Sequence, residues 1–273
     1  MSRRARLTST TVEVGALRLH VRTARPDGAC SGPVLLVPGL GSSSRYLEPL
    51  GVELAADRLV VAPDLPGTGR TPRAEDPLSL DGLVGTLQRL MERTTGRATV
   101  VANSFGCILA IELALQAPDL VERLVLTSPV LAPRARGPVP LVARFARAMR
   151  HEPPRYLALV VRDVVRASVR RAGEDLRSLL AVPVLERAAG LAVPALVVRG
   201  TRDHLVPPPF ARRVAAHIPR GEFVELDSSH ALPFAAPRAL ADLVRARDAG
   251  RHGPHGDLGE QHPPPGAGSS RAG

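Results

Sequence analysis

The sequence contains no lysine and no tryptophan, and aromatic residues make up only 3% of its 273 residues. All 36 basic residues are therefore arginines, and with 26 acidic residues they give a formal net charge of +10. A basic chain often binds nucleic acid, but base stacking needs aromatic side chains that are scarce here. Exclusive use of arginine, with abundant alanine, glycine and proline, instead indicates the codon bias of a GC-rich genome. We therefore expect no nucleic-acid partner.

Cysteines and long apolar runs are also scarce. Cys30 and Cys107 are the two cysteines, and neither stands in a metal-like spacing, so we expect no disulfide framework and no bound metal. No uninterrupted apolar run approaches the ~20 residues that a membrane-spanning helix needs. The basic residues 1–6 are followed by threonine-rich and charged sequence rather than by the apolar core of a signal peptide. These features predict a cytoplasmic protein without a transmembrane segment.

Apolar residues make up 44% of the chain, and they follow two spacing patterns that alternate along the sequence. Short β-branched runs typical of buried strands are followed by stretches with helical spacing, which predicts a parallel sheet with right-handed crossovers. We expect an α/β fold with an eight-stranded, mostly parallel sheet and helices on both of its faces. The expected strands are residues 11–14, 17–22, 33–37, 58–62, 98–102, 121–127, 194–198 and 222–226. The expected helices of this core are residues 45–56, 80–93, a stretch after 104, 208–218 and 234–247.

One long segment interrupts this alternation. Residues 133–191 hold two or three helical stretches and no convincing strand, as expected for a helical cap, or lid, inserted after the sixth strand. The core would then consist of residues 1–132 and 192–248. Residues 249–273 are mostly Gly, Pro, His, Ser and Arg, which cannot bury enough apolar surface to fold, so we expect a disordered tail.

Ser104 stands where a buried strand turns into a helix. The sequence Ala-Asn-Ser-Phe-Gly at residues 102–106 places small residues on both sides, so that strand and helix can pass closely. A serine at such a turn is exposed beside the positive helix N-terminus, which is how a fold presents a nucleophile. A helix N-cap is the alternative role for a serine at this boundary.

Polar residues follow the other expected strands, where functional groups of a parallel sheet collect. Asp64 follows the fourth strand, Asp203 the seventh, and Asp227 and His230 the eighth. Serine is a poor nucleophile unless an imidazole takes its proton and a carboxylate orients that imidazole. The order Ser…Asp…His therefore predicts nucleophilic catalysis.

Several motifs together resemble the α/β-hydrolase fold superfamily over residues 10–248. They are the serine turn, Asp-Leu-Pro-Gly-Thr-Gly at residues 64–69, Gly-Thr-Arg-Asp-His-Leu-Val-Pro at residues 200–207, and Ser229-His230 followed by two prolines. The resemblance implies Ser104 as nucleophile, His230 as general base and then acid, and Asp203 as its orienting carboxylate.

The resemblance also implies an oxyanion hole built from the backbone N–H groups of Leu40 and Phe105, and no cofactor. The chain departs from the superfamily in having Pro38 where most relatives have histidine, and Ala102 where the serine turn usually begins with glycine. Among the other acids, Asp64 is expected to have a structural role in its turn. Cys107 is expected to serve packing, and His204 and His217 to lie on the surface.

The expected cap is rich in arginine. Arg162, Arg166 and Arg170 are four residues apart and share one helical face, opposite the apolar residues 157, 160, 161 and 164. We expect a lid helix with a solvated basic face and an apolar face over the pocket. The alternative is that the basic stripe attracts an anionic or carrier-bound acyl substrate, or an anionic membrane surface. The ten arginines of this region are Arg134, Arg136, Arg144, Arg147, Arg150, Arg155, Arg162, Arg166, Arg170 and Arg171.

These features together predict a serine hydrolase that cleaves a carboxylic ester or related acyl bond of a small molecule through an acyl-enzyme. The same three residues could serve a thioesterase, a C–C bond hydrolase or an acyltransferase. A protein of another class, a ligand-binding or signalling protein with slow turnover, could retain the same fold. We expect a monomer or a homodimer.

Overall fold

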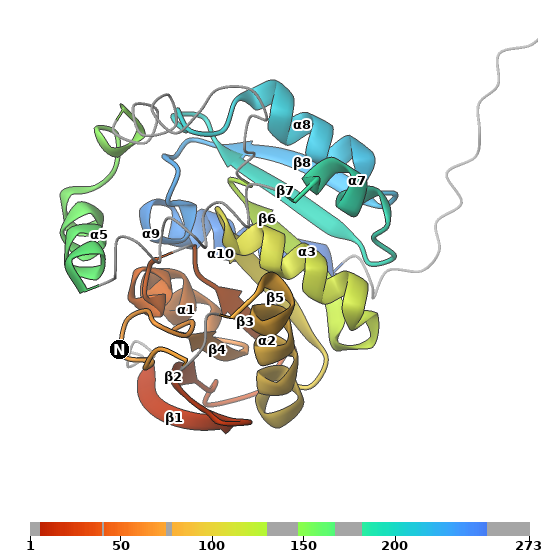
Figure 1. Cartoon of the computed structure of the whole chain (residues 1–273). Coiled ribbons are helices and arrows are strands. Elements are labelled where there is room, and N and C mark those ends of the chain that lie inside the picture. Colours follow the sequence, from red (N-terminus) through yellow and green to blue (C-terminus); the bar gives the residue numbers. More distant parts are fainter. Residues whose placement is uncertain (1–5, 40, 75–77, 130–146, 167–181, 250–273) are drawn as a thin grey trace, which may run out of the picture.

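The computed structural model describes residues 6–39, 41–74, 78–129, 147–166 and 182–249. They form an eight-stranded sheet in the order β1-β2-β4-β3-β5-β6-β7-β8 (Figure 1). The first hairpin is antiparallel and joins β4 in antiparallel pairing, whereas all other neighbouring strands are parallel. The expected eight-stranded, mostly parallel sheet is thereby confirmed. Its strands are β1 (Thr8–Val14), β2 (Leu17–Ala24), β3 (Pro33–Val37), β4 (Leu59–Pro63), β5 (Ala98–Asn103), β6 (Val121–Thr127), β7 (Ala195–Gly200) and β8 (Gly221–Leu226).

Helices cover both faces of the sheet, as its apolar strands require. Every residue of β5 is buried, and side chains of the central strands contribute to two apolar clusters, one on each face. On the face nearer the viewer in Figure 1 lie α2 (Leu80–Thr94), α3 (Gly106–Gln116), α7 (Val184–Ala189) and α8 (Pro208–His217). The other face is covered by α1 (Glu48–Leu54), α9 (Leu232–Ala235) and α10 (Pro237–Ala249). None of the helices in the described ranges is long and apolar enough to cross a membrane.

Two of the expected helices are divided in the structure. The expected helix 234–247 consists of α9 and α10, with Ala236 between them at φ −135° and ψ 50°. Pro237 causes this break, because proline disfavours helical backbone in the residue before it and has no N–H to donate. Similarly, residues 45–56 begin as a 3-10 turn, η1 (Ser44–Leu47), before α1. Apolar spacing continues across both breaks, which explains why the pattern alone predicted single helices.

Only part of the expected cap is described, namely residues 147–166 and 182–191. The first part ends in α5 (Pro154–Arg166), which lies to one side of the sheet in Figure 1. The second part contains α7, which packs on the core through buried Val184 and Ala188. The remaining residues of the expected cap lie outside the described residues, and so does the expected tail apart from Ala249.

The exposed face of α5 differs from the expected basic face. Val161 is 62% exposed and Ala158 is also exposed, whereas the Arg162 side chain is only 34% exposed. Arg162 is drawn inward by the neighbouring buried Asp163, with 3.6 Å between guanidinium nitrogen and carboxylate oxygen. Val161, expected on the face over the pocket, is therefore exposed, and Arg162, expected on the solvated face, is partly exposed. The side chain of Arg166, and Arg170, lie outside the described residues.

Candidate active site

Ser104 occupies a strained turn between β5 and α3. Its φ of 58° lies in the left-handed region that non-glycine residues rarely adopt, and its N–H donates to the Thr127 carbonyl at 2.9 Å. A Cβ on Gly106 would lie only 2.6 Å from the Pro38 carbonyl oxygen, so glycine is required where the turn meets the loop after β3. This backbone holds the serine side chain partly exposed at the end of a fully buried strand.

The structure brings Ser104, His230 and Asp203 together from three loops. The Ser104 hydroxyl oxygen lies 3.0 Å from His230 Nε2, and His230 Nδ1 lies 2.9 Å from Asp203 Oδ2. The other carboxylate oxygen of Asp203 accepts hydrogen bonds from the N–H groups of Leu205 and Val206, at 2.8 and 3.1 Å. A carboxylate next to Nδ1 places the proton on that nitrogen and leaves Nε2 free to accept the serine proton.

The pKa values of the acid and the imidazole shift apart. Burial alone would lower the pKa of His230, but the charge and hydrogen bond of Asp203, together with the charge of Glu152, raise it above its ordinary value. Burial alone would raise the pKa of Asp203, but the charge and hydrogen bond of His230, with the hydrogen bond from the Val206 N–H, lower it. Asp203 therefore stays ionised while His230 titrates, as a base oriented by a carboxylate requires.

Asn103, which the sequence analysis did not single out, connects the loops around Ser104. Its side-chain amide donates to the carbonyl oxygens of Thr127 and His230, at 3.2 Å each. Its side-chain oxygen accepts a hydrogen bond from the Tyr46 hydroxyl at 3.1 Å, and that hydroxyl accepts one from the Gly39 N–H at 2.8 Å. A polar residue that ends an otherwise apolar buried strand was the available signal for this role.

The expected oxyanion donors are only partly described. Phe105 is the N-cap residue of α3, where backbone N–H groups have no acceptor within the helix. Leu40, the other expected donor, lies outside the described residues. Its neighbour Gly39 lies against the serine, because a Cβ on Gly39 would be 3.4 Å from the Ser104 Cβ. Since the Gly39 N–H already donates to Tyr46, it is not available to a substrate.

Asp64 belongs to a separate buried network. Its carboxylate is fully buried and accepts hydrogen bonds from the Ser44 backbone and hydroxyl, the Arg22 guanidinium and the Arg70 N–H. His20 Nδ1 lies 2.8 Å from the same carboxylate. These contacts join η1, β2 and the turn after β4, in agreement with the expected structural role.

Among the described residues, the remaining candidates make no side-chain hydrogen bond to Ser104, although the Cys107 N–H donates to the Ser104 carbonyl at 3.0 Å. Asp227 is exposed and forms a surface ion pair. Cys107 is buried with its thiol near two backbone carbonyls, and burial raises its pKa. His204 and His217 are exposed, as expected. Within the described ranges, no group of three or more His, Cys, Asp or Glu side chains is arranged to hold a metal ion.

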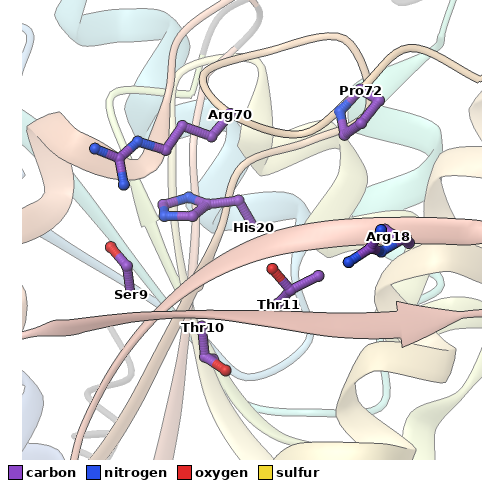
Figure 2. A pocket seen from close by; sticks show the side chains of 7 residues that line it. All are labelled: Ser9, Thr10, Thr11, Arg18, His20, Arg70 and Pro72. Atoms are coloured by element: carbon purple, nitrogen blue, oxygen red, sulfur yellow. The ribbon is translucent and has the colours of Figure 1, made fainter.

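A hollow of about 410 Å³ lies beside the β1–β2 hairpin (Figure 2). Three hydroxyl residues of β1 line it together with Arg18, Arg70, Pro72 and His20. The His20 Nε2 atom is buried and has no hydrogen-bond partner among the described residues. Neither Ser104 nor His230 lines this hollow, so it is distinct from the candidate active site.

Comparisons with known proteins agree with this architecture. A sequence model described as the alpha/beta hydrolase family matches residues 34–243. A protein of Variovorax paradoxus named carbamate hydrolase RutD is 30% identical over 223 residues, which cover 72% of this chain and 83% of that protein. RutD of Azorhizobium caulinodans is 25% identical over 240 residues, which cover 78% of this chain and 89% of the RutD chain. The crystal structure of the enol-lactonase from Burkholderia xenovorans superposes with a TM-score of 0.68 at 23% identity, over 87% of this chain and 98% of that one.

Proposed function

Because the chain belongs to the alpha/beta hydrolase family, we propose that it is a serine hydrolase that cleaves a carboxylic ester or a related acyl bond. The observation that carries this proposal is the contact of 3.0 Å between the Ser104 hydroxyl and His230 Nε2, with Asp203 on the far side of the ring. A serine, an imidazole and a carboxylate in this sequence of contacts can form an acyl-enzyme without a metal or cofactor.

In the proposed reaction, Ser104 attacks the acyl carbonyl while His230 takes the serine proton and returns it to the leaving group. A water molecule, deprotonated by His230, then releases the acyl group. The N–H groups of Phe105 and Leu40 would donate to the oxyanion, and the loss of one such donor typically lowers the rate by ~10²–10³. Asp203 orients the imidazole and stabilises its protonated form.

The names of similar proteins support a carbonyl bonded to oxygen or nitrogen as the substrate group. They include a carbamate hydrolase and an enol-lactonase. We propose a small-molecule acyl substrate. Thioester or C–C bond cleavage and acyl transfer are further reactions open to the same three residues. A cytoplasmic location is part of this proposal, and cell fractionation with an antibody against the chain would test it.

Labelling with a fluorophosphonate probe tests the nucleophile. We expect rapid labelling of the native chain and none of Ser104→Ala, because the probe reacts only with an activated serine. Ser79→Ala, which changes the N-cap serine of α2, is the matched control and should be labelled at the native rate. A native chain that remains unlabelled, or labelling that persists in Ser104→Ala, would reject the proposal.

Turnover separates a hydrolase from a slow binding protein. We would measure product release from p-nitrophenyl esters of increasing acyl length, and from matched thioester and carbamate substrates. Continuous release at a steady rate is expected for a hydrolase, whereas one burst of product per chain indicates slow deacylation. The substrate with the highest kcat/KM identifies the preferred acyl bond.

A further inference from the structure

Two buried acidic side chains of the segment 147–166 contact the loops that surround Ser104. Glu152, just before α5, and Asp163, within α5, are each 5% exposed. They are the acidic residues of a segment that is otherwise basic or apolar. Burying a carboxylate is costly unless it receives hydrogen bonds, so the contacts that these two groups make require an explanation.

Glu152 receives hydrogen bonds from three consecutive residues of the loop that carries the imidazole. Its Oε1 accepts from the N–H groups of His230, at 2.7 Å, and Ala231, at 3.2 Å. Its Oε2 accepts from the Ser229 hydroxyl at 2.8 Å. The His230 backbone is thus held by Glu152 on its N–H and by the Asn103 amide on its carbonyl.

We infer that Glu152 is a positioning residue for His230, which it holds by the backbone so that the imidazole stays between Ser104 and Asp203. The inference rests on the proposed function, because it assigns a role toward the proposed general base. A misplacement of about 1 Å in a catalytic group can lower a rate by ~10²-fold, so a residue that does not touch the substrate can still control the rate.

The charge of Glu152 gives it a second effect on the imidazole. The charged and titratable groups near His230 are Asp203, on its Nδ1 side, and Glu152, on its backbone side, and both favour the protonated ring. Burial raises the pKa of Glu152 itself, opposed by its hydrogen bonds and by the His230 charge. Tyr156 lies near Glu152 and Asp163, and burial raises the pKa of its phenol, so it adds no charge. Removal of the Glu152 charge should therefore lower the pKa of His230.

Asp163 fastens the same segment to the loop after β3. Its Oδ2 accepts hydrogen bonds from the Ser43 N–H at 2.8 Å and the Ser43 hydroxyl at 2.7 Å. Between the two acids, the Tyr156 ring packs against the rings of Tyr46 and Phe234, each at 5.7 Å. The segment 147–166 therefore contacts both the loop of the proposed base, through Glu152, and the loop before η1, through Asp163. A shift of this segment would move the hydrogen-bond acceptors of both loops.

Two substitutions of Glu152 separate its geometry from its charge. Glu152→Gln keeps an oxygen that can accept both N–H groups but removes the charge, whereas Glu152→Ala leaves two buried N–H groups unpaired. Glu186→Gln, at an exposed glutamate of α7, is the matched control for the loss of one negative charge. We would measure fluorophosphonate labelling rates from pH 5 to 9, the pKa of the His230 ring by NMR, and thermal melting.

We expect Glu152→Ala to be labelled ~10²-fold more slowly than the native chain at the pH of maximal rate. Glu152→Gln should recover most of that rate, with the acid limb of its profile and the His230 pKa both displaced to lower pH. Glu186→Gln should match the native chain in all three measurements. If Glu152→Ala fails to fold, the profile and NMR titration of Glu152→Gln still decide the question.

The inference is overturned if both Glu152 variants fold and retain the native labelling rate and the native His230 pKa. A lower melting temperature with no change in the labelling rate of the folded protein, or in its pH profile, would indicate a purely structural role and would also overturn it. Failure of the proposed function gives a different result, since the native chain itself would then not be labelled at Ser104.

Discussion

Two buried aspartate–histidine pairs can be compared within the described part of the chain. Asp203 and His230 are joined through Nδ1 at 2.9 Å, and Asp64 and His20 through Nδ1 at 2.8 Å. In both pairs the aspartate is at most 2% exposed and the histidine at most 7% exposed. The hydrogen bond between acid and ring therefore does not distinguish a candidate active site from a structural pair.

The surroundings of the two pairs differ in charge. Burial lowers the pKa of His20, and the positive charges of Arg22 and Arg70 add to this effect, so that the attraction of Asp64 is outweighed. The pKa of His230 is raised by the charge and hydrogen bond of Asp203 and by the second negative charge of Glu152, and within the described ranges no arginine is among the groups that shift it. The ring pKa is thus lowered in one aspartate–histidine pair and raised in the other.

The Nε2 atoms of the two rings also differ in what they meet. His230 Nε2 faces the Ser104 hydroxyl, whereas His20 Nε2 has no partner among the described residues. Asp64 uses most of its hydrogen-bonding capacity to hold η1 and the turn after β4. An aspartate–histidine pair is a candidate for catalysis when a hydroxyl lies within hydrogen-bond distance of the ring Nε2. Without such a hydroxyl, the pair serves as a structural support.

The largest expected difference between the pairs concerns activity. His230→Gln should lower ester hydrolysis by about 10⁴-fold or more, because serine loses its general base. His20→Gln, the matched substitution in the other pair, should keep the folded enzyme within about tenfold of the native rate. Steady-state kinetics on a p-nitrophenyl ester measures both. An equal loss in the two variants would show that the pairs do not have separate roles.

The second prediction concerns stability, and it compares the buried Asp64 with an exposed aspartate outside both pairs. Asp64→Ala removes the acceptor of a buried arginine and histidine, and we expect a loss of about 3–5 kcal/mol in the free energy of unfolding. Asp227→Ala, at an exposed ion pair, should change it by at most about 1 kcal/mol. Urea denaturation measures both variants. A small effect of Asp64→Ala would contradict the role of this network as a structural support.

The turn after β4 offers a smaller test of the Asp64 network. Gly69 has a φ of 55°, and a Cβ there would lie only 2.2 Å from the Asp64 carboxylate oxygen. Gly15 has a φ of 59° with nothing within 4 Å of the same position. Gly15→Ala should cost about 1–2 kcal/mol for the left-handed backbone alone, and Gly69→Ala about 1–3 kcal/mol more for the displaced carboxylate. Equal costs in urea denaturation would show that the turn adapts without strain.

The finest distinction is the order of the two histidine pKa values. An NMR titration of ring carbons should place the pKa of His230 above 6.5 and that of His20 below it. Burial together with Arg22 and Arg70 lowers the pKa of His20, whereas Asp203 and Glu152 raise that of His230. His230 then contributes stability that is present below pH 6.5 and is lost as the pH rises through its folded pKa. His20 contributes stability that is present above pH 6.5 and is lost as the pH falls through its folded pKa. The reverse order of the two titrations would contradict this electrostatic account.

Local patterns were sufficient for the sheet and for the motifs. Buried strands and helices differ in the spacing of their apolar residues, so the eight strands and their mostly parallel arrangement could be predicted from sequence and were confirmed. Ser104, Asp203 and His230 could be selected because each follows a strand, and the structure brings them into contact, while their catalytic roles remain a proposal. The break at Ala236 shows where such prediction fails, because a helical spacing of apolar residues can continue through a proline that ends the helix.

The chain by itself determined where its strands end and which reactive side chains follow them, because these are properties of neighbouring residues. Only the tertiary structure decided how distant residues meet. Glu152 lies 78 positions before His230, and Asp163 lies 120 positions after Ser43. Along the chain, both acids stand among the arginines of the expected lid. Packing buried both against the two loops around Ser104, since a buried carboxylate is stable only where backbone N–H and hydroxyl donors converge on it.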